Sequence, residues 1–423
     1  MRGYLNYLPN HLGVLTIPMR DRHSVSVALW IRAGARYETK RSNGISHFLE
    51  HMLFKGTKKR STRQIKEEIE GVGGILNAFT GEEFTCYFAK LLREHYPKAL
   101  DVLSDMVNHS VIDKHELEKE RTVILEEIKM YKDLPSQYVQ EAMSELLWPD
   151  QALGRPIAGT EESVSNLSRK DVLDYRNQFY HTKNILVSVS GPVEHTEVED
   201  YARKHFSGRS CYGRSRFKPA LTRSSSPKFH FIEKDTEQTH FVIGLHGLSR
   251  FHPDRFKLGI LNVILGGNMS SRLFEEVREK RGLAYEIRSS GSYHHDTGAV
   301  TISAGVDTQK AHSAIRVILA ELGKLCRRKV KTGELRRAKD YFKGQLALAL
   351  EDTLDHVLWV GERVMDRGEI PDREKIIAQI EAVTLEDVMK MANHIFMTKN
   401  LHLSLIGPVK EKLQQKIKKD FEI

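Results

Sequence analysis

The chain has little cysteine and no long apolar run. Only three cysteines occur among 423 residues: Cys86, Cys211 and Cys326. They lack metal-binding spacing and leave an odd thiol under any pairing, which disfavours a disulfide framework and indicates a reducing compartment. No stretch approaches the roughly 18 apolar residues of a membrane span. Asn, Pro and His interrupt the first 21 residues before a secretory apolar segment can form. We therefore expect a cytoplasmic protein without a membrane partner.

Charge of one sign is not in large excess either. Lys and Arg number 65 and Asp and Glu 56, which leaves a net charge of +9. A basic run at 324–331 is the strongest local patch, but no nucleic-acid-binding module accompanies it. A solvated helix end is the favoured interpretation of that run, and no nucleic-acid partner is expected.

What the chain does contain is the pentad His47-Phe48-Leu49-Glu50-His51. Residues four apart lie on one face of a helix, so both histidines can reach a single metal ion. Glu50 shares that face and is suited to take a proton from a water molecule at the metal. The pattern predicts a zinc hydrolase.

The alternative to a metal site is a chance match of the pentad on a solvated helix, and the residues around the pentad disfavour it. Apolar residues surround it on nearly all sides, which indicates a buried helix. These residues are Ile45, Phe48, Leu49, Met52, Leu53 and Phe54. Buried histidine and glutamate side chains are costly unless they are paired or bind a metal. The sequence therefore favours a metal site.

A third ligand is expected on a second helix, over residues 114–133. Glu120 and Glu127 fall on its apolar stripe, whereas Glu126 points about 100° away. The stripe consists of Leu117, Ile124, Ile128 and Tyr131. Taken alone, the helix is an ordinary one with glutamates at the core edge. Together with the pentad, it favours Glu127 as a ligand and Glu120 as the group that orients Glu127 or a histidine.

These features resemble the pitrilysin or insulinase family of zinc metallopeptidases, M16, in its short two-domain form. Mitochondrial processing peptidase beta subunits and bacterial processing-protease-like members have this form. The family combines HxxEH with a later glutamate, here at a distance of 127 − 51 = 76 residues. The resemblance implies one Zn²⁺ per chain on His47, His51 and Glu127, Glu50 as general base and Glu120 as supporting acid. The ligand set also suits Mn²⁺ and Co²⁺.

Residues 73–88 resemble the strand beside the active site in this family. The resemblance implies that Asn77, Ala78 and Phe79 bind substrate, with an extended peptide pairing along the strand. From the pattern alone, an ordinary core strand after a Gly-Gly turn is favoured.

An internal repeat indicates two domains. Residues 171–193 and 387–409, which are 216 residues apart, each read as a helix, a Thr-Lys-Asn turn, an alternating strand and Gly-Pro-Val. We predict an α+β fold of two homologous domains, each an antiparallel sheet with helices packed on it, pairing into a clamshell. The expected boundaries are a catalytic domain at 1–210, a linker at 211–227 and a C-terminal domain at 228–423.

The second copy lacks the pentad. Residues 256–268 stand in its place without an acid or histidine on the apolar face, so no zinc is expected there. Arg278 and Tyr285 resemble the arginine and tyrosine element of the family, which implies contact with substrate and with the developing oxyanion. Gly282 is expected to end the helix, so that Tyr285 begins a strand. The alternative is a capped surface helix followed by a core tyrosine.

The predicted function is zinc-dependent endopeptidase action on unstructured peptides or flexible protein segments inside a closed chamber. Because short members of the family pair two chains, we expect a homodimer in which Arg278 and Tyr285 of one subunit complete the zinc site of the other. The alternatives are a non-catalytic assembly or binding subunit of the same fold, and a processing subunit that needs a separate partner chain.

Overall fold

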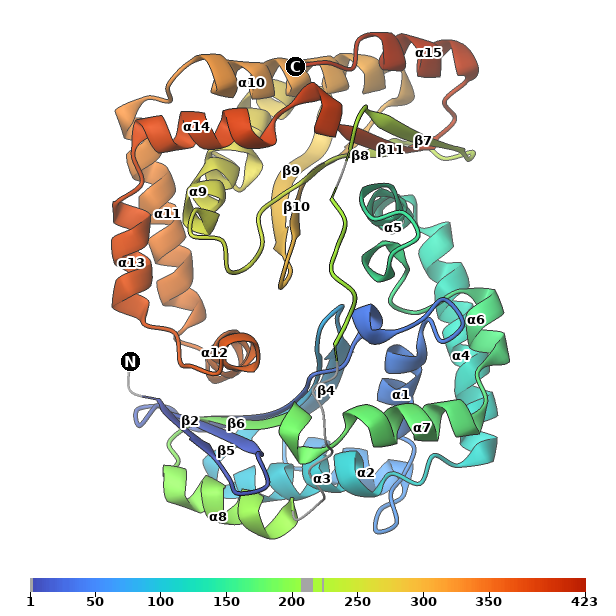
Figure 1. The fold of residues 1–423 in the computed structure, drawn as a ribbon, viewed down its shortest axis with the longest axis vertical. Helices are drawn as coiled ribbons and strands as arrows, with labels where there is room; N and C mark the ends of the chain where they lie inside the picture. Colours follow the sequence, from blue (N-terminus) through green and yellow to red (C-terminus); the bar gives the residue numbers. More distant parts are fainter. Residues whose placement is uncertain (1–2, 207–215, 223) are drawn as a thin grey trace. The chain divides into compact units, whose positions relative to one another are not determined.

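The computed structural model describes residues 3–206, 216–222 and 224–423, so Cys211 and part of the predicted linker 211–227 lie outside the described residues. The chain forms two compact units (Figure 1). Unit 1 consists of Met1–Lys129, Pro156–Lys218 and Ala347–Arg373. Unit 2 consists of Met130–Arg155, Pro219–Leu346 and Glu374–Ile423.

Unit 1 is built on a six-stranded sheet in the order β1-β2-β6-β3-β5-β4. The strands are β1 (Tyr4–Tyr7), β2 (Gly13–Pro18), β3 (Ser24–Ile31), β4 (Ile75–Thr80), β5 (Thr85–Leu92) and β6 (Ile185–Gly191). Its helices are α1 (Ile45–Leu53), α2 (Thr62–Glu70), α3 (Tyr96–His109), most of α4 (Lys114–Asp133), α6 (Glu161–Asn166), α7 (Arg169–Phe179), α8 (His195–His205) and α12 (Thr353–Arg367).

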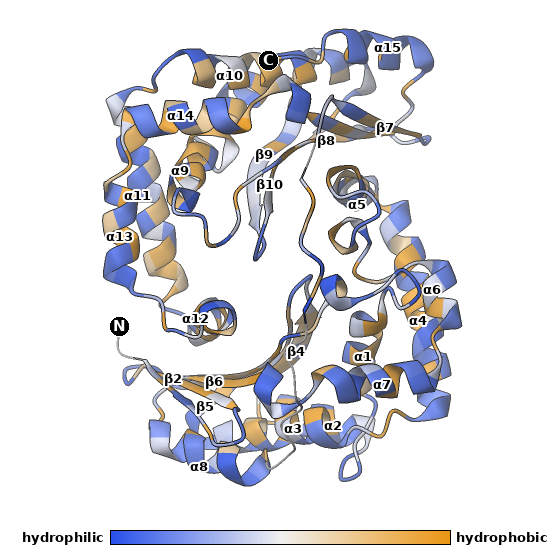
Figure 2. Cartoon of the chain, viewed as in Figure 1, coloured by the Kyte–Doolittle hydropathy of each residue, from blue (hydrophilic) through white to orange (hydrophobic). Residues whose placement is uncertain are grey.

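The central strand β3 shows why this sheet is covered on both faces. Side chains alternate along a strand, so Val27 and Leu29 enter one apolar core with residues of α1 and α3. Ala28 and Trp30 enter a second core with residues of α12. In Figure 2 the strands of the sheet are largely hydrophobic, whereas the outward sides of α7 and α8 are hydrophilic.

Unit 2 repeats the arrangement with a five-stranded sheet in the order β7-β11-β8-β10-β9. The strands are β7 (Lys228–Glu233), β8 (Thr239–His246), β9 (Ala284–Tyr293), β10 (Gly298–Val306) and β11 (His402–Gly407). Its helices are α5 (Pro135–Leu147), α9 (Arg255–Gly266), α10 (Ala311–Arg327), most of α11 (Thr332–Ala349), α13 (Arg373–Glu381), α14 (Leu385–Ile395) and α15 (Glu411–Lys419).

The prediction of two α+β units with helices packed on their sheets is confirmed. The repeat supplies equivalent elements: α7 and α14 both begin with a capping box, and each leads through a Thr-Lys-Asn turn into β6 or β11. The prediction of wholly antiparallel sheets needs one correction. β2 pairs with β6 in parallel, and β7 pairs with β11 in parallel. Both pairs join strands from the two ends of a unit, which a crossover connection allows and a hairpin does not.

The compact units also differ from the predicted domains 1–210 and 228–423, because each unit takes one helix from the other half of the chain. Helix α5 packs against β8 and β11 of unit 2, and α12 packs against β3 and β6 of unit 1. An apolar helix face predicts that the helix is covered, but does not identify the sheet that covers it.

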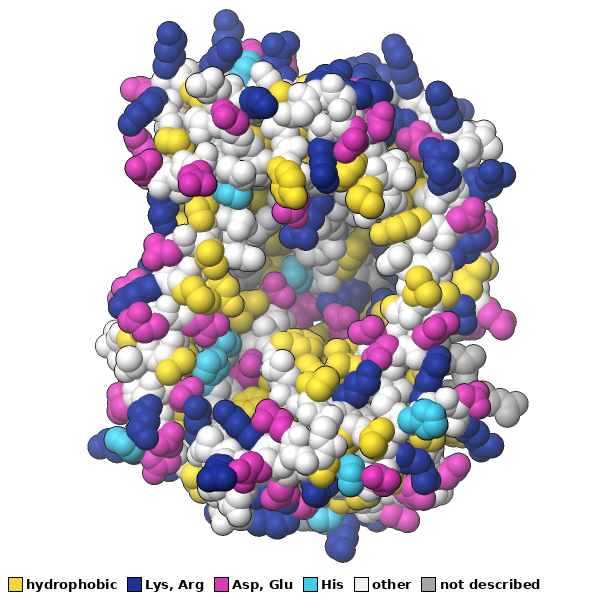
Figure 3. All heavy atoms as spheres, turned by 180° about the vertical axis from the view of Figure 1, so that it is seen from behind, with side chains coloured by type: hydrophobic (Ala, Val, Ile, Leu, Met, Phe, Trp, Pro, Cys, Tyr) yellow, Lys and Arg dark blue, Asp and Glu magenta, His cyan; other side chains and the backbone are white. Residues whose placement is uncertain are grey.

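The surface carries charges of both signs. Figure 3 shows basic and acidic side chains interspersed over one face of the molecule, as the modest net charge suggests. Among the described residues, no helix has the length and apolar character needed to traverse a bilayer.

Candidate metal centre

The pentad lies on α1, a helix that is buried along most of its length, as predicted. Gly44 precedes the helix with a φ of 90° and has no side chain to cap it. The carboxylate of Glu38 does so instead, accepting hydrogen bonds from the Ser46 N–H at 2.9 Å and from the Gly44 N–H at 2.8 Å. Burial raises the pKa of Glu38, and these hydrogen bonds oppose that rise. A nearby acid outside the helix thus accepts from the N–H groups of Gly44 and Ser46 at the helix start.

Three side chains of unit 1 converge beside α1. His47, His51 and Glu127 each offer one ligand atom, and these atoms all lie within 4.8 Å of one another. Oε2 of Glu127 is 3.8 Å from Nε2 of His47 and 3.7 Å from Nε2 of His51. These distances exceed ordinary hydrogen bonds. They are close to the separation of about 3.4 Å between ligand atoms that each lie about 2.1 Å from a tetrahedral zinc ion.

The protonation of the histidines fits a metal site. Burial and the neighbouring His51 lower the pKa of His47 to about 4, so its imidazole is neutral at pH 7, as a ligand must be. Nδ1 of His51 lies 3.1 Å from Oε2 of Glu120. A hydrogen bond there places the proton of His51 on Nδ1 and leaves Nε2 free to bind a metal.

Helix α4 supplies both acids from its inward face. Glu120 is buried, and the side chain of Glu127 is 23% exposed. Glu126 points outward and pairs with Lys129, as the helical periodicity predicts. Of the two roles considered for Glu120, the geometry matches orientation of a histidine. Two imidazoles and one carboxylate form a donor set that suits zinc and leaves a coordination position open for water.

Glu50 lies next to this cluster without joining it. Its Oε2 accepts a hydrogen bond from the hydroxyl of Thr80 at 2.5 Å. Burial raises the pKa of Glu50, while Thr80 and His51 oppose the rise and Glu127 adds to it. A carboxylate that is held by one oxygen and has an elevated pKa is suited to general base catalysis.

The predicted substrate strand β4 is an edge strand. Among the described residues it pairs only with β5, which leaves its other edge open. Asn77 and Phe79 lie on its exposed side, whereas Ala78 and Thr80 are partly buried. Phe79 is 38% exposed and its ring packs edge-on against Trp30 at 5.7 Å. The strand is therefore more accessible than an ordinary core strand.

Arg278 and Tyr285 lie together in unit 2. Arg278 belongs to a π-helical segment, Phe274–Glu279, and its guanidinium lies 5.2 Å from the centre of the Tyr285 ring. Gly282 has a φ of 55°, and β9 begins at Ala284, as predicted. Tyr285 is 78% exposed, which is inconsistent with a core tyrosine. Helix α9, the counterpart of α1, buries only apolar residues and glycine.

Sequence reasoning missed three residues of the site: Glu38, Lys55 and Thr80. Nζ of Lys55 lies 2.5 Å from Oε1 of Glu120. Lys55 and Thr80 act through contacts between segments that are distant in sequence, whereas Glu38 acts through a turn of six to eight residues. The sequence signals for these residues are indirect: Gly44 has no side chain to accept a capping hydrogen bond, and Thr80 directly follows the predicted substrate residues.

Comparisons with known proteins place the chain in a family of peptidases. The family model described as Insulinase (Peptidase family M16) matches residues 14–161, and the model described as Peptidase M16 inactive domain matches residues 166–342. The "Uncharacterized zinc protease YmxG" of Bacillus subtilis is 39% identical over 91% of this chain and 93% of its own length. An uncharacterized zinc protease of Streptomyces coelicolor is 35% identical over 96% of this chain and 89% of its own.

Solved structures share the fold. A protease from Helicobacter pylori superimposes with a TM-score of 0.89 at 22% identity, covering 96% of this chain and 99% of that one. A chain of complex III2 from Candida albicans superimposes with a TM-score of 0.87 at 20% identity, covering 99% of this chain and 100% of that one.

Proposed function

Because the chain belongs to the insulinase family of peptidases, M16, we propose that it is a zinc-dependent endopeptidase. The observation that carries the proposal is the convergence of His47, His51 and Glu127 beside Glu50. Zinc, when bound, polarises the scissile carbonyl and lowers the pKa of the attacking water. The ligand set accommodates one ion per chain.

The residues around the ligands would carry the proton transfer. Glu50 takes a proton from the attacking water and delivers it to the leaving amine. Thr80 donates to one oxygen of Glu50, which leaves the other oxygen free for that transfer. Glu120 keeps His51 in the tautomer that a ligand requires.

We propose that substrates are unstructured peptides or flexible protein segments. The open edge of β4 offers main-chain hydrogen bonds to an extended peptide. Asn77 and Phe79 would contact its side chains, and Ala78 is small enough for the two backbones to approach closely. A folded protein does not present a free extended backbone, so it is a poor substrate for this mode of binding.

Arg278 and Tyr285 are proposed to hold the oxyanion side of the reaction from a second copy of the chain. A guanidinium and a phenol both donate hydrogen bonds, and the two groups lie together on an exposed part of unit 2. Mixing His47→Ala with Tyr285→Phe tests this sharing. Recovery of activity in the mixture is expected, and absence of recovery despite demonstrated subunit exchange would overturn the homodimer proposal.

The experiment that tests the function compares wild type with Glu50→Gln, using zinc analysis and a quenched-fluorescent unstructured peptide. Wild type should carry about one zinc per chain, as one three-ligand site implies. Glu50→Gln should keep its zinc and lose about 10²–10⁴-fold in kcat, the usual contribution of a general base. The matched control is Glu126→Gln, which changes an exposed acid on α4 and should leave both readouts unchanged.

The remaining outcomes separate the alternatives. Zinc-loaded wild type that cleaves no peptide in any size-exclusion fraction would favour a subunit that needs a separate partner chain. A wild-type chain that binds no zinc would favour a non-catalytic assembly subunit. The intact ligand set argues against the second outcome.

A further inference from the structure

The loop after α1, residues 54–61, lies between the two helices that bear the candidate ligands. Gly56 turns the chain with a φ of 109°. Its carbonyl accepts from the Val111 N–H at 3.3 Å, and Thr57 forms a β-bridge with Ser110, just before α4 begins. The Ser110 hydroxyl also donates to the carbonyl of Met52 on α1 at 3.3 Å. The loop therefore links the end of α1 to the start of α4.

We propose that Lys55 is a positioning residue for the metal site, and that a buried ion-pair network around Arg60 holds its loop in place. The inference rests on the proposed zinc site. It concerns a residue that touches no ligand directly and acts through Glu120.

Glu120 is held from both sides. One oxygen, Oε1, pairs with Nζ of Lys55 at 2.5 Å, and the other, Oε2, faces Nδ1 of His51 at 3.1 Å. The side chain of Glu120 is only 7% exposed, so an unpaired carboxylate oxygen there is costly. Removing the ammonium of Lys55 favours orientations that turn Glu120 toward water. His51 then loses the acceptor that fixes its ring and its tautomer.

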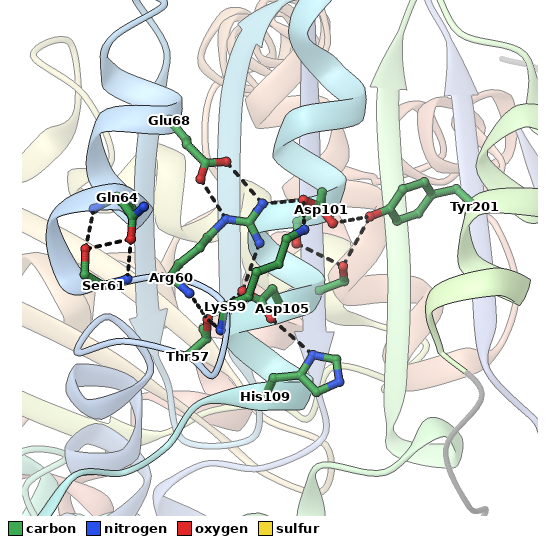
Figure 4. Close-up of polar contacts among 11 residues, drawn as sticks. Thr57, Lys59, Arg60, Ser61, Gln64, Glu68, Asp101, Asp105, His109 and Tyr201 are labelled. Carbon is green, nitrogen blue, oxygen red and sulfur yellow. Dashed lines mark hydrogen bonds and ion pairs between the residues drawn. The ribbon is translucent and has the colours of Figure 1, made fainter.

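Figure 4 shows the network that anchors the loop. Arg60 is 5% exposed and donates to Glu68 at 2.9 and 3.1 Å and to Asp105 at 2.9 Å, and it also pairs with Asp101. The hydroxyl of Thr57 donates to Asp105 at 2.6 Å. Three carboxylates from α2 and α3 thus fix one guanidinium, which leaves the loop backbone little freedom. The backbone of Lys55 is therefore held in one position, from which its side chain reaches Glu120.

The test measures metal retention rather than activity. Zinc-loaded wild type, Lys55→Met and Lys58→Met are mixed with an excess of a coloured chelator, and the rate of zinc release is followed. Lys58 lies on the same loop with an exposed side chain, so Lys58→Met is the matched control. Lys55→Met should release zinc about ten-fold faster, the lower end of the usual effect of losing an outer-sphere partner. Lys58→Met should match wild type.

Two further readouts separate positioning from simple damage to the fold. The visible absorption of the Co²⁺-substituted protein should change in Lys55→Met, because the ring of His51 is no longer fixed. The metal-free Lys55→Met protein should keep a single cooperative unfolding transition at a somewhat lower temperature, because Glu120 loses its partner but can turn toward water. Lys55→Arg keeps the charge and should restore slow zinc release.

The outcomes distinguish failure of the positioning role of Lys55 from failure of the proposed function. If wild type binds zinc and Lys55→Met releases it at the wild-type rate, the positioning role is overturned while the proposed function stands. If wild type binds no zinc, the proposed function itself fails. Arg60→Lys should also speed zinc release. If it lowers only the unfolding temperature, the network does not support the site.

Discussion

The two units share a sheet topology and differ in what their equivalent helices carry. In unit 1, α1 exposes His47, Glu50 and His51 toward an acid from α4, whereas α9 in unit 2 buries only apolar residues and glycine. Unit 2 therefore shows that the fold does not require the polar cluster. His47 and Glu50 carry a desolvation cost, seen in the lowered pKa of His47 and the raised pKa of Glu50. A metal bound at the site would offset part of that cost.

The N-terminal ends of α1 and α9 also differ, because only α1 is capped by an acidic side chain. Helix α1 begins after a glycine, Gly44, and buried Glu38 supplies its cap from outside the helix. Helix α9 begins after Asp254, which makes no capping hydrogen bond and pairs instead with Lys257. The helix with the candidate ligands is thus fixed by an additional side-chain cap that its counterpart lacks.

The largest expected contrast comes from matched substitutions in α1 and α9. His47→Ala should abolish zinc binding and peptide cleavage, because two ligands on one face are reduced to one. Asn262→Ala on α9 removes a long contact to the Ser289 carbonyl at 3.4 Å and should leave zinc content unchanged. Zinc analysis of both purified variants makes the measurement. Wild-type zinc content in His47→Ala would show that the ion binds elsewhere.

Next in size is the contrast between the two helix starts. Glu38→Ala leaves the N–H groups of Gly44 and Ser46 without their acceptor inside the protein, whereas the amide of Asn43 keeps its hydrogen bond to the Pro156 carbonyl. Unsatisfied buried donors cost about 1–3 kcal/mol each, so we expect a loss of about 3 kcal/mol. Asp254→Ala removes a partly exposed pair with Lys257 and a 4.0 Å contact with His252, and should cost under about 1 kcal/mol. Urea unfolding midpoints compare the two, and equal shifts would contradict the capping role of Glu38.

The sequence predicted the parts of this site that depend on local periodicity. Spacings of four and seven residues place His47 with His51 and Glu120 with Glu127 on single helix faces, whatever the rest of the fold does. Contacts between distant segments were not predictable in this way. The pairing of Lys55 with Glu120 and the parallel pairing of β2 with β6 depend on how the elements pack. The cap from Glu38 is local, but it depends on the path of the turn before α1, which helical periodicity does not give.

The placement of α5 and α12 was not predictable for the same reason: each helix packs on the sheet formed by the other half of the chain. Both helices have apolar faces at the same position of the repeat, and both sheets have faces to cover. The apolar face of either helix would be buried equally well by the sheet of its own half of the chain or by the sheet of the other half. The choice depends on connections and close contacts, which a residue pattern does not encode.

The smallest predicted contrast concerns the packing of α12 and α5 on their sheets. Gly361 on α12 faces Trp30 of unit 1, where a Cβ would lie 2.3 Å from the indole nitrogen. Gly244 on β8 faces Met143 of α5, where a Cβ would lie 2.3 Å from the sulfur. A rigid indole cannot move aside as a thioether can. Gly361→Ala should therefore cost about 2 kcal/mol and Gly244→Ala about 1 kcal/mol or less, from overpacking.

The control for this comparison is Gly344 on α11, where a Cβ would meet nothing within 4 Å. Gly344→Ala should stabilise the protein by up to about 1 kcal/mol, because alanine is the better helix former. The same helix-forming gain acts at Gly361, so a net loss there isolates the contact with Trp30. Urea unfolding followed by tryptophan fluorescence measures all three variants. If Gly361→Ala stabilises the protein as Gly344→Ala does, α12 does not pack closely on the unit 1 sheet.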